Sequence, residues 1–184
     1  LRDLLLLLAL VNFTIATQWS QLALFAKHAL DASDAEVGLL YAAGSAGAIL
    51  LALLAAPIRR RVPFGALVLG AIGVGGIVVV GLALTPWLAL AVPLWALRTG
   101  LGQLMAITTS SLRQAVTPPH LLGRVATVGQ VASWSAIPAG ALAGGWAIDA
   151  TGSVRAVYVG IGVACVALAV GFAFSAVRRG ASGG

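Results

Sequence analysis

The sequence predicts an all-α, polytopic membrane protein with six transmembrane helices. Of its 184 residues, 60% are hydrophobic and only 9% are charged, whereas about 25% are charged in an ordinary soluble domain. Long charge-free stretches account for most of the chain, and each is at least as long as the roughly 20 apolar residues that cross hydrocarbon as a helix. We therefore expect residues 1–184 to form a single six-helix transmembrane domain, with no soluble catalytic domain beside it.

The breaks between the apolar stretches carry helix-start signals. Ser33 is followed three residues later by Glu36, the spacing of a capping box that satisfies free backbone N–H groups. Pro63, Pro86 and the prolines at 118–119 suit first helical turns, where the N–H that proline lacks has no partner. The expected helices cover about residues 4–29, 34–57, 63–84, 87–114, 119–149 and 153–178.

Basic residues gather on one side of this predicted topology. Short connections make successive helices alternate in direction, and cytoplasmic loops carry excess Lys and Arg. With a cytoplasmic N-terminus, Lys27 and Arg155 lie outside, and all the other loop cations lie inside. The inner residues are Arg2, Arg59, Arg60, Arg61, Arg113, Arg124, Arg178 and Arg179. Together with a composition rich in Ala, Gly and Val, this predicts a multi-pass protein of the bacterial cytoplasmic (inner) membrane with both termini in the cytoplasm.

Polar side chains are concentrated in the first and fourth predicted helices. The first carries Thr14, Gln18 and Gln21 on one face, at i, i+4, i+7 spacing, and the fourth carries Arg98 and Gln103. The third and sixth helices are almost entirely apolar, so we expect them to face lipid while the first and fourth line an interior. The same order of polar and apolar helices recurs after three helices. Because three is an odd number of spans, the second set of three has the opposite orientation in the membrane. This pattern predicts a three-plus-three inverted repeat, an architecture of transporters.

Arg98 is the one charge expected near the middle of the membrane. A charge there costs about 2.5–3.5 kcal/mol on insertion scales and marks a functional site by default. It is either a substrate or gating contact, or an arginine that snorkels or bonds helix-end carbonyls. The glutamines and tryptophans nearby either line a cavity for a ligand, or they join helices by hydrogen bonds and packing. The expected substrate cavity comprises Gln18, Trp19, Gln21, Arg98 and Gln103.

The sequence offers no catalytic or metal-ligating constellation. His28 and His120 stand at helix ends, too far from Ser45 to activate its hydroxyl, and no cluster has metal-ligand spacing. We expect no enzyme activity, no cofactor, no metal and no nucleic-acid partner. No carboxylate that could couple transport to protons lies deep inside a predicted span. Asp149, at the outer end of the fifth helix, is the nearest candidate, and a solvated boundary residue is the alternative.

Small residues in the fifth predicted helix indicate close packing. Gly140 and Gly144 have the spacing that lets membrane helices approach each other, and Gly145 follows directly. Pro138 lies inside the same helix, where proline removes a backbone hydrogen bond, so we expect a kink or a local opening there. These residues are predicted to serve helix packing.

The loop between the fourth and fifth predicted helices carries a longer motif. Residues 111–125 read S-L-R-Q-A-V-T-P-P-H-L-L-G-R-V. This is similar to the S-x-R-Q-x-x-x-P-x-x-x-x-G-R-V signature in the C-terminal half of major facilitator superfamily exporters, close to the enterobactin-exporter and macrolide-efflux group. The segment P-A-G-A-L-A-G-G at 138–145 and the arginine turn at 59–61 support the resemblance. It covers essentially the whole chain, as helices seven to twelve of a twelve-helix transporter.

The resemblance implies proton-driven efflux of a small organic compound, of drug or siderophore type, by alternating access. It implies that Arg113 and Arg124, with Arg59, Arg60 and Arg61, act as gates on the inner face; positive-inside anchoring is the alternative. The family's usual acidic partner for the arginine turn is missing here, so gating within this chain is not expected at that turn.

The resemblance also implies that the chain is a fragment, one half of an antiporter. Its expected partners are the lipid bilayer, the substrate, protons, and a second half, because alternating access needs two halves about a shared site. That second half is either the N-terminal six helices or a second copy. The alternatives are a free-standing six-helix protein that works as a homodimeric transporter, or a membrane scaffold that transports nothing.

Overall fold

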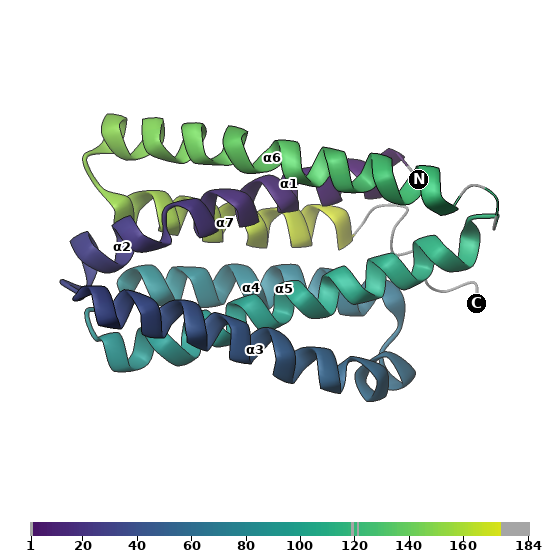
Figure 1. The fold of residues 1–184 in the computed structure, drawn as a ribbon, viewed down its shortest axis with the longest axis horizontal. Helices are drawn as coiled ribbons and strands as arrows, with labels where there is room; N and C mark the ends of the chain where they lie inside the picture. Colours follow the sequence, from purple (N-terminus) through teal and green to yellow (C-terminus); the bar gives the residue numbers. More distant parts are fainter. Residues whose placement is uncertain (1, 119, 121, 174–184) are drawn as a thin grey trace.

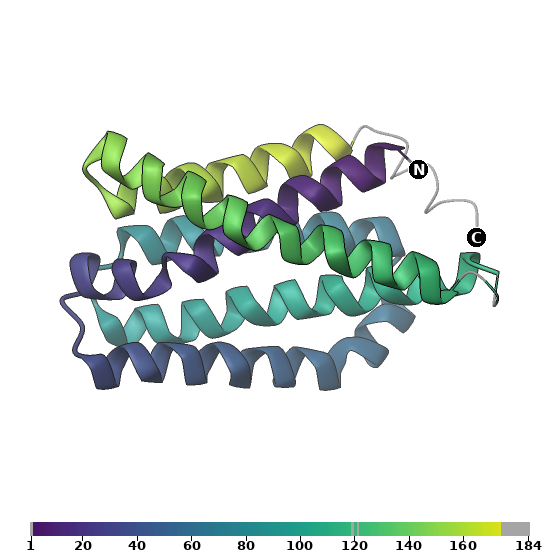
Figure 2. The same ribbon diagram turned by 45° about the horizontal axis from the view of Figure 1, so that its top comes forward.

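The structure, a computed structural model, describes residues 2–118, 120 and 122–173. Within these ranges the secondary structure is entirely helical, which confirms the all-α prediction (Figure 1). The helices are α1 (Arg2–Ser20), α2 (Leu22–Ala29), α3 (Asp34–Arg61), α4 (Phe64–Leu84), α5 (Leu88–Val116), α6 (Leu122–Thr151) and α7 (Val154–Ala173). They run lengthwise through one elongated bundle, and turns at its two ends join them (Figures 1 and 2).

The first predicted helix is interrupted, so the expectation of one helix over about 4–29 is wrong at Gln21. This residue has φ −99° and ψ 2° and separates α1 from α2. Helical bonds still bridge the site, because the Gln21 N–H donates to the Thr17 carbonyl (3.1 Å) and the Phe25 N–H donates to the Gln21 carbonyl (2.8 Å). One turn earlier, the Tyr158 hydroxyl of α7 donates to the Gln18 carbonyl (2.7 Å). A side chain that bonds a helix carbonyl is a known cause of such distortions.

The start of α3 confirms the predicted capping box. The Ser33 hydroxyl accepts from the Glu36 N–H (3.4 Å), and the Glu36 carboxylate accepts from the Ser33 N–H (2.8 Å). The end of α3 differs, because the helix continues through Pro57 to Arg61. Proline removes only one hydrogen bond of the ladder, and arginines in a last turn interact favourably with the helix dipole.

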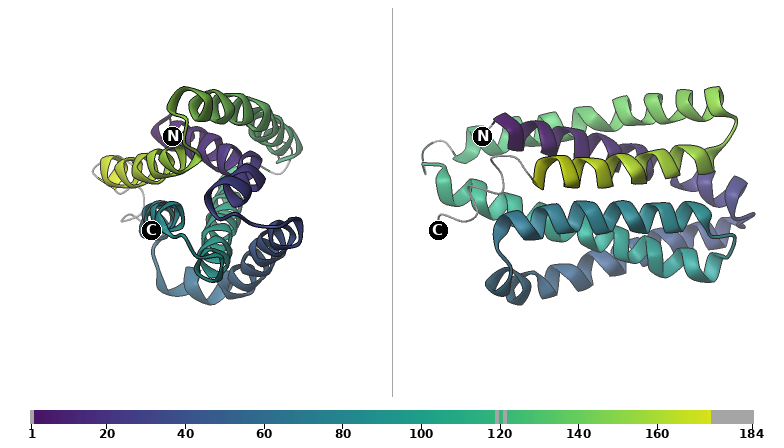
Figure 3. Two further views of the ribbon diagram at one scale, coloured as in Figure 1. Left: turned by 90° about the vertical axis from the view of Figure 1, so that its left-hand side faces the viewer. Right: turned by 180° about the vertical axis from the view of Figure 1, so that it is seen from behind.

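Three helix pairs form the body of the bundle. α3 packs along α5, α4 along α7 and α1 along α6, and α4 also contacts α5 (Figure 3). Two crossings are close enough to require glycine. A Cβ on Gly47 would lie 1.9 Å from the Ala96 carbonyl oxygen, and one on Gly76 would lie 2.6 Å from the Gly162 carbonyl oxygen. Small residues bring membrane helices together in this way.

Four of the described helices, α3, α4, α5 and α7, are long and apolar enough to cross a membrane. α4 is the most buried of these four, so the expectation that the third predicted helix faces lipid holds only for one stripe. That exposed stripe consists of Ala66, Gly70, Val74, Ile77 and Leu84. In a bilayer an apolar side chain suits lipid and protein equally well, and apolarity alone therefore does not separate outer from inner helices.

Apart from Arg98, the charged side chains that the structure describes lie at the two ends of the bundle. At the end that holds α2, Lys27 pairs with Asp34 at 2.6 Å, and Arg155 donates to the carbonyls of Ala29, Ala83 (2.8 Å) and Thr85 (3.1 Å). The opposite end holds the last turn of α3 and the end of α5, with the arginine turn and Arg113 (Figure 1). The arginine turn therefore lies at the opposite end of the bundle from the Lys27–Asp34 pair.

Candidate functional site

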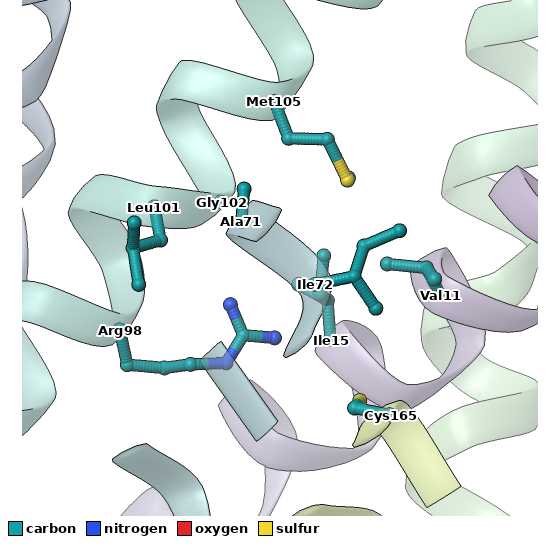
Figure 4. Close-up of a pocket in the computed structure, with 9 residues that line it drawn as sticks. All are labelled: Val11, Ile15, Ala71, Ile72, Arg98, Leu101, Gly102, Met105 and Cys165. Atoms are coloured by element: carbon teal, nitrogen blue, oxygen red, sulfur yellow. The ribbon is translucent and has the colours of Figure 1, made fainter. Parts of the chain in front are cut away.

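Arg98 is buried inside the bundle, with 7% of its surface exposed. Its side chain leaves α5 toward α4, α1 and α7 and borders a cavity of about 10 Å³ (Figure 4). Space for the guanidinium comes from two glycines: a Cβ on Gly75 would meet Arg98 Nε at 3.9 Å, and one on Gly102 would meet Nη1 at 3.4 Å. The other lining residues are Val11, Ile15, Ala71, Ile72, Leu101, Met105 and Cys165. The surroundings of this cation are therefore almost entirely apolar.

The charge of Arg98 is not balanced within the described part of the chain. Its Nε has no hydrogen-bond partner there, and no acid pairs with it. All five acidic residues of the chain stand in loops or in the first or last turns of helices. Arginine cannot escape burial by losing its proton, and a buried cation without a partner is costly. The hydrogen bonds from a guanidinium to helix-end carbonyls that the structure does contain are made by Arg155, at the end of the bundle that holds α2.

Two more buried donors lie one turn from this cavity. Among the described side chains, the Nε2 of Gln18 and the Nε1 of Trp95 also lack hydrogen-bond partners, and both residues are almost completely buried. Gln18 follows Ile15 by one turn on α1, and Trp95 precedes Arg98 by one turn on α5. All three orphaned atoms are N–H donors. The interior between α1 and α5 therefore has a surplus of donors over acceptors.

Three aromatic side chains meet where α1, α3 and α5 approach each other. The Trp19 ring lies 5.3 Å from the Trp95 ring, edge to face, and 6.0 Å from the Tyr41 ring. Trp95 is buried, but Trp19 and Tyr41 are 39% and 37% exposed. The sequence placed Trp19 in the cavity and missed Tyr41, whose position gave no signal because its partner lies on another helix. We call Trp19, Tyr41 and Trp95 the aromatic cluster.

The two remaining predicted cavity residues lie in different surroundings. The Gln21 side chain donates to the Ala141 carbonyl of α6 (3.0 Å) and so joins two helices. Gln103 is exposed on α5, on the same face as Thr99, Ser110 and Arg113 by the i, i+3/i+4 spacing of a helix. Of the five predicted residues, Arg98 is the one that borders the small interior cavity.

The predicted packing residues lie where α6 meets α1. A Cβ on Gly140 would stand 2.9 Å from the Thr17 backbone nitrogen, and one on Gly144 would stand 2.7 Å from a Thr17 methyl group. Gly145 has more room, since its nearest contact is 3.9 Å away. Pro138 is exposed within α6, which continues through it.

The predicted gating arginines make few contacts. The Arg59 guanidinium donates to the Ser111 hydroxyl (2.8 Å), which joins the end of α3 to α5, and Arg113 lies 3.5 Å from the Ser110 hydroxyl. Arg60 and Arg61 are exposed. Arg124 lies in the first turn of α6, and its side chain is outside the described part. Arg178 and Arg179 are outside the described residues altogether. Within the described part of the chain, no acid pairs with Arg59, Arg60, Arg61 or Arg113.

A larger groove of about 1050 Å³ runs between α1, α6 and α7. Its lining is apolar except for two threonines, Thr14 and Thr151. Apolar, open surfaces of this kind suit acyl chains in a bilayer, and the groove carries no charge or orphaned donor. The chemistry of the described residues is therefore concentrated around Arg98 and the aromatic cluster.

The fold and these features define a class, an all-helical protein with several helices suited to a membrane. Comparison with known protein families and with curated protein sequences found no match.

Proposed function

We propose that the chain is one six-helix half of a secondary active transporter of the major facilitator type. In this proposal all six spans cross the membrane, α1 and α2 together forming the first. The half exports a small organic compound of drug or siderophore type by proton-driven alternating access. It works against a second half, either the N-terminal six helices of the same transporter or a second copy of this chain.

The pairing of the helices is the observation that carries this proposal. We number the six spans in chain order, with α1 and α2 together as the first. In a three-plus-three repeat, each span of the first half corresponds to the span three places later. The corresponding pairs are α1/α2 with α5, α3 with α6, and α4 with α7. The contact between α3 and α5 therefore corresponds to the contact between α6 and α1, and both are present. The contact between α4 and α7 is its own counterpart. The contact of α4 with α5 becomes that of α7 with α1 and α2, which is also present. This correspondence supports a three-plus-three inverted repeat.

The placement of polar and aromatic groups supports a pathway along one face of this half. The exposed part of the aromatic cluster, Trp19 and Tyr41, and the exposed Gln103 come from α1, α3 and α5. The three helices are linked here, since Trp19 contacts both of its cluster partners. Exposed aromatic rings, with an amide two turns farther along α5, fit an amphipathic organic compound. The second half would supply the opposite wall.

The distribution of charge supports the orientation that we propose. The arginine turn and Arg113 lie at one end of the bundle, and positive-inside topology puts that end in the cytoplasm of a bacterial inner-membrane protein. The N-terminus of α1 lies at this same end (Figure 1). Coupling to protons then needs a carboxylate from the second half, because the acids of this chain stand at helix ends.

Efflux from cells tests the proposed function. The whole protein is produced in a bacterial strain that lacks its main exporters, and the accumulation of a panel of amphipathic fluorescent dyes is measured with and without a protonophore. We expect lower accumulation of at least one dye, and we expect the protonophore to restore it. Trp19→Ala and Gln103→Ala should weaken efflux, whereas Leu53→Ala, at a 74% exposed position on α3, should not. Unchanged accumulation of every dye, with the protein present in the membrane, would contradict transport.

A further inference from the structure

The buried guanidinium of Arg98 combines three properties that are rarely found together. It is 93% removed from solvent, its Nε has no acceptor among the described residues, and it borders an interior cavity. A buried cation is stable when an opposite charge lies beside it. Because the chain's acids stand at helix ends, the compensating charge has to come from outside the chain.

The size of the cavity restricts what that charge can be. About 10 Å³ accommodates roughly one water-sized particle, whereas sites for drug-sized ligands enclose about 300–1000 Å³. The side chains around the guanidinium come from four helices, α1, α4, α5 and α7 (Figure 4). A drug-sized compound is therefore too large for this cavity, whereas a single-atom anion needs little more room than a water molecule.

We propose that Arg98 and its cavity form a binding site for one small monovalent anion, of the size of chloride or bromide, held inside this half of the bundle. The inference goes beyond the proposed transport function and does not depend on it. The anion would accept from the Arg98 guanidinium and would neutralise the only charge that the chain carries deep within a span.

The lining determines which anions the site prefers. Apart from the guanidinium, the ion would contact aliphatic side chains and the sulfur atoms of Met105 and Cys165. An ion that enters such a site loses its hydration shell and gains few polar contacts in exchange. The free-energy cost of binding is therefore largest for strongly hydrated ions. A guanidinium is itself weakly hydrated. Bromide and chloride should therefore bind, whereas fluoride and the divalent sulfate should not.

Binding of radiolabelled chloride to the purified, membrane-reconstituted protein tests the site. The protein is prepared in gluconate at fixed ionic strength, and chloride is added with or without unlabelled bromide, fluoride or sulfate. We expect saturable binding of about one chloride per chain, displaced by bromide and not by fluoride or sulfate. Lack of saturable binding would overturn the proposal.

Variants separate this site from general attraction of anions to a basic protein. Arg98→Gln should reduce chloride affinity at least tenfold. The matched control is Lys27→Gln, which also removes one cation but at an exposed position, and it should bind as the unaltered protein does. Ala71→Val retains the arginine and fills part of the cavity, so it should weaken binding even if Arg98→Gln does not fold. Unchanged binding in Ala71→Val, or in a folded Arg98→Gln protein, would contradict the site.

Discussion

Tyr158 of α7 binds the first span on both sides of its interruption. Its hydroxyl donates to the Gln18 carbonyl of α1 (2.7 Å), and its ring stacks on Phe25 of α2 with the ring centres 4.4 Å apart. The side chain is fully buried. α7 therefore contacts α1 and α2 on either side of Gln21.

Removing this hydroxyl should destabilise the bundle. Tyr158→Phe preserves the stacked ring but leaves a buried carbonyl without its donor, so we expect a loss of about 1–3 kcal/mol in the free energy of unfolding. Denaturant titration of the purified protein, monitored by tryptophan fluorescence, measures this loss. Tyr41→Phe is the matched control, because that ring is 37% exposed, and it should change stability by less than about 0.5 kcal/mol. Equal effects of the two variants would exclude a special role for Tyr158.

Replacing two glycines of α3 by alanine should change the stability of the protein in opposite directions. A Cβ on Gly47 would lie 1.9 Å from the Ala96 carbonyl oxygen, so Gly47→Ala has to push α3 away from α5. We expect a loss of at least 1–3 kcal/mol, the usual cost of overpacking. Gly38 has nothing within 4 Å of its virtual Cβ, and Gly38→Ala should stabilise the helix by about 0.5–1 kcal/mol. Thermal unfolding of both variants checks the contrast, and a harmless Gly47→Ala would show that the helices are not in contact there.

Arg155 should matter more than the exposed ion pair at the same end of the bundle. Its guanidinium bonds the carbonyls of Ala29, Ala83 and Thr85, at the ends of α2 and α4. Hydrogen bonds to a charged group contribute about 1.5–3 kcal/mol each, so Arg155→Met should cost at least about 2 kcal/mol. Lys27→Gln breaks only the exposed pair with Asp34 and should cost at most about 1 kcal/mol. Salt titration adds a check, because only the contribution of the exposed Lys27–Asp34 pair should fall as ionic strength rises.

The proposed orientation predicts which ends are accessible from outside the cell. Arg60 and Ala150 are exposed at opposite ends of the bundle, in the last turn of α3 and near the end of α6. The native Cys165 is buried, so it should not react. Arg60→Cys should be labelled by a membrane-impermeant maleimide only in opened cells, and Ala150→Cys in intact cells. Labelling of both positions from the same side would contradict the odd number of spans that separates them.

Features encoded by neighbouring residues could be predicted from the sequence, and features that depend on distant residues could not. The Ser33–Glu36 capping box is local and was predicted correctly. The interruption at Gln21 follows a hydrogen bond from Tyr158, which is far away in the chain, to the Gln18 carbonyl. The burial of α4 was missed because lipid and protein interiors select the same apolar side chains. At the candidate site, the charge pattern singled out Arg98, but only the structure revealed its small cavity and the neighbouring aromatic cluster.

The mass of the complex in its native membrane tests the central claim most directly. The protein is extracted in mild detergent from the cells that produce it, and light scattering gives the protein mass without the detergent. One half of an alternating-access transporter requires a second half, so we expect at least twice the 18.5 kDa of this chain, as a longer polypeptide or as a pair. A stable, solitary six-helix unit of 18.5 kDa would contradict the transporter account.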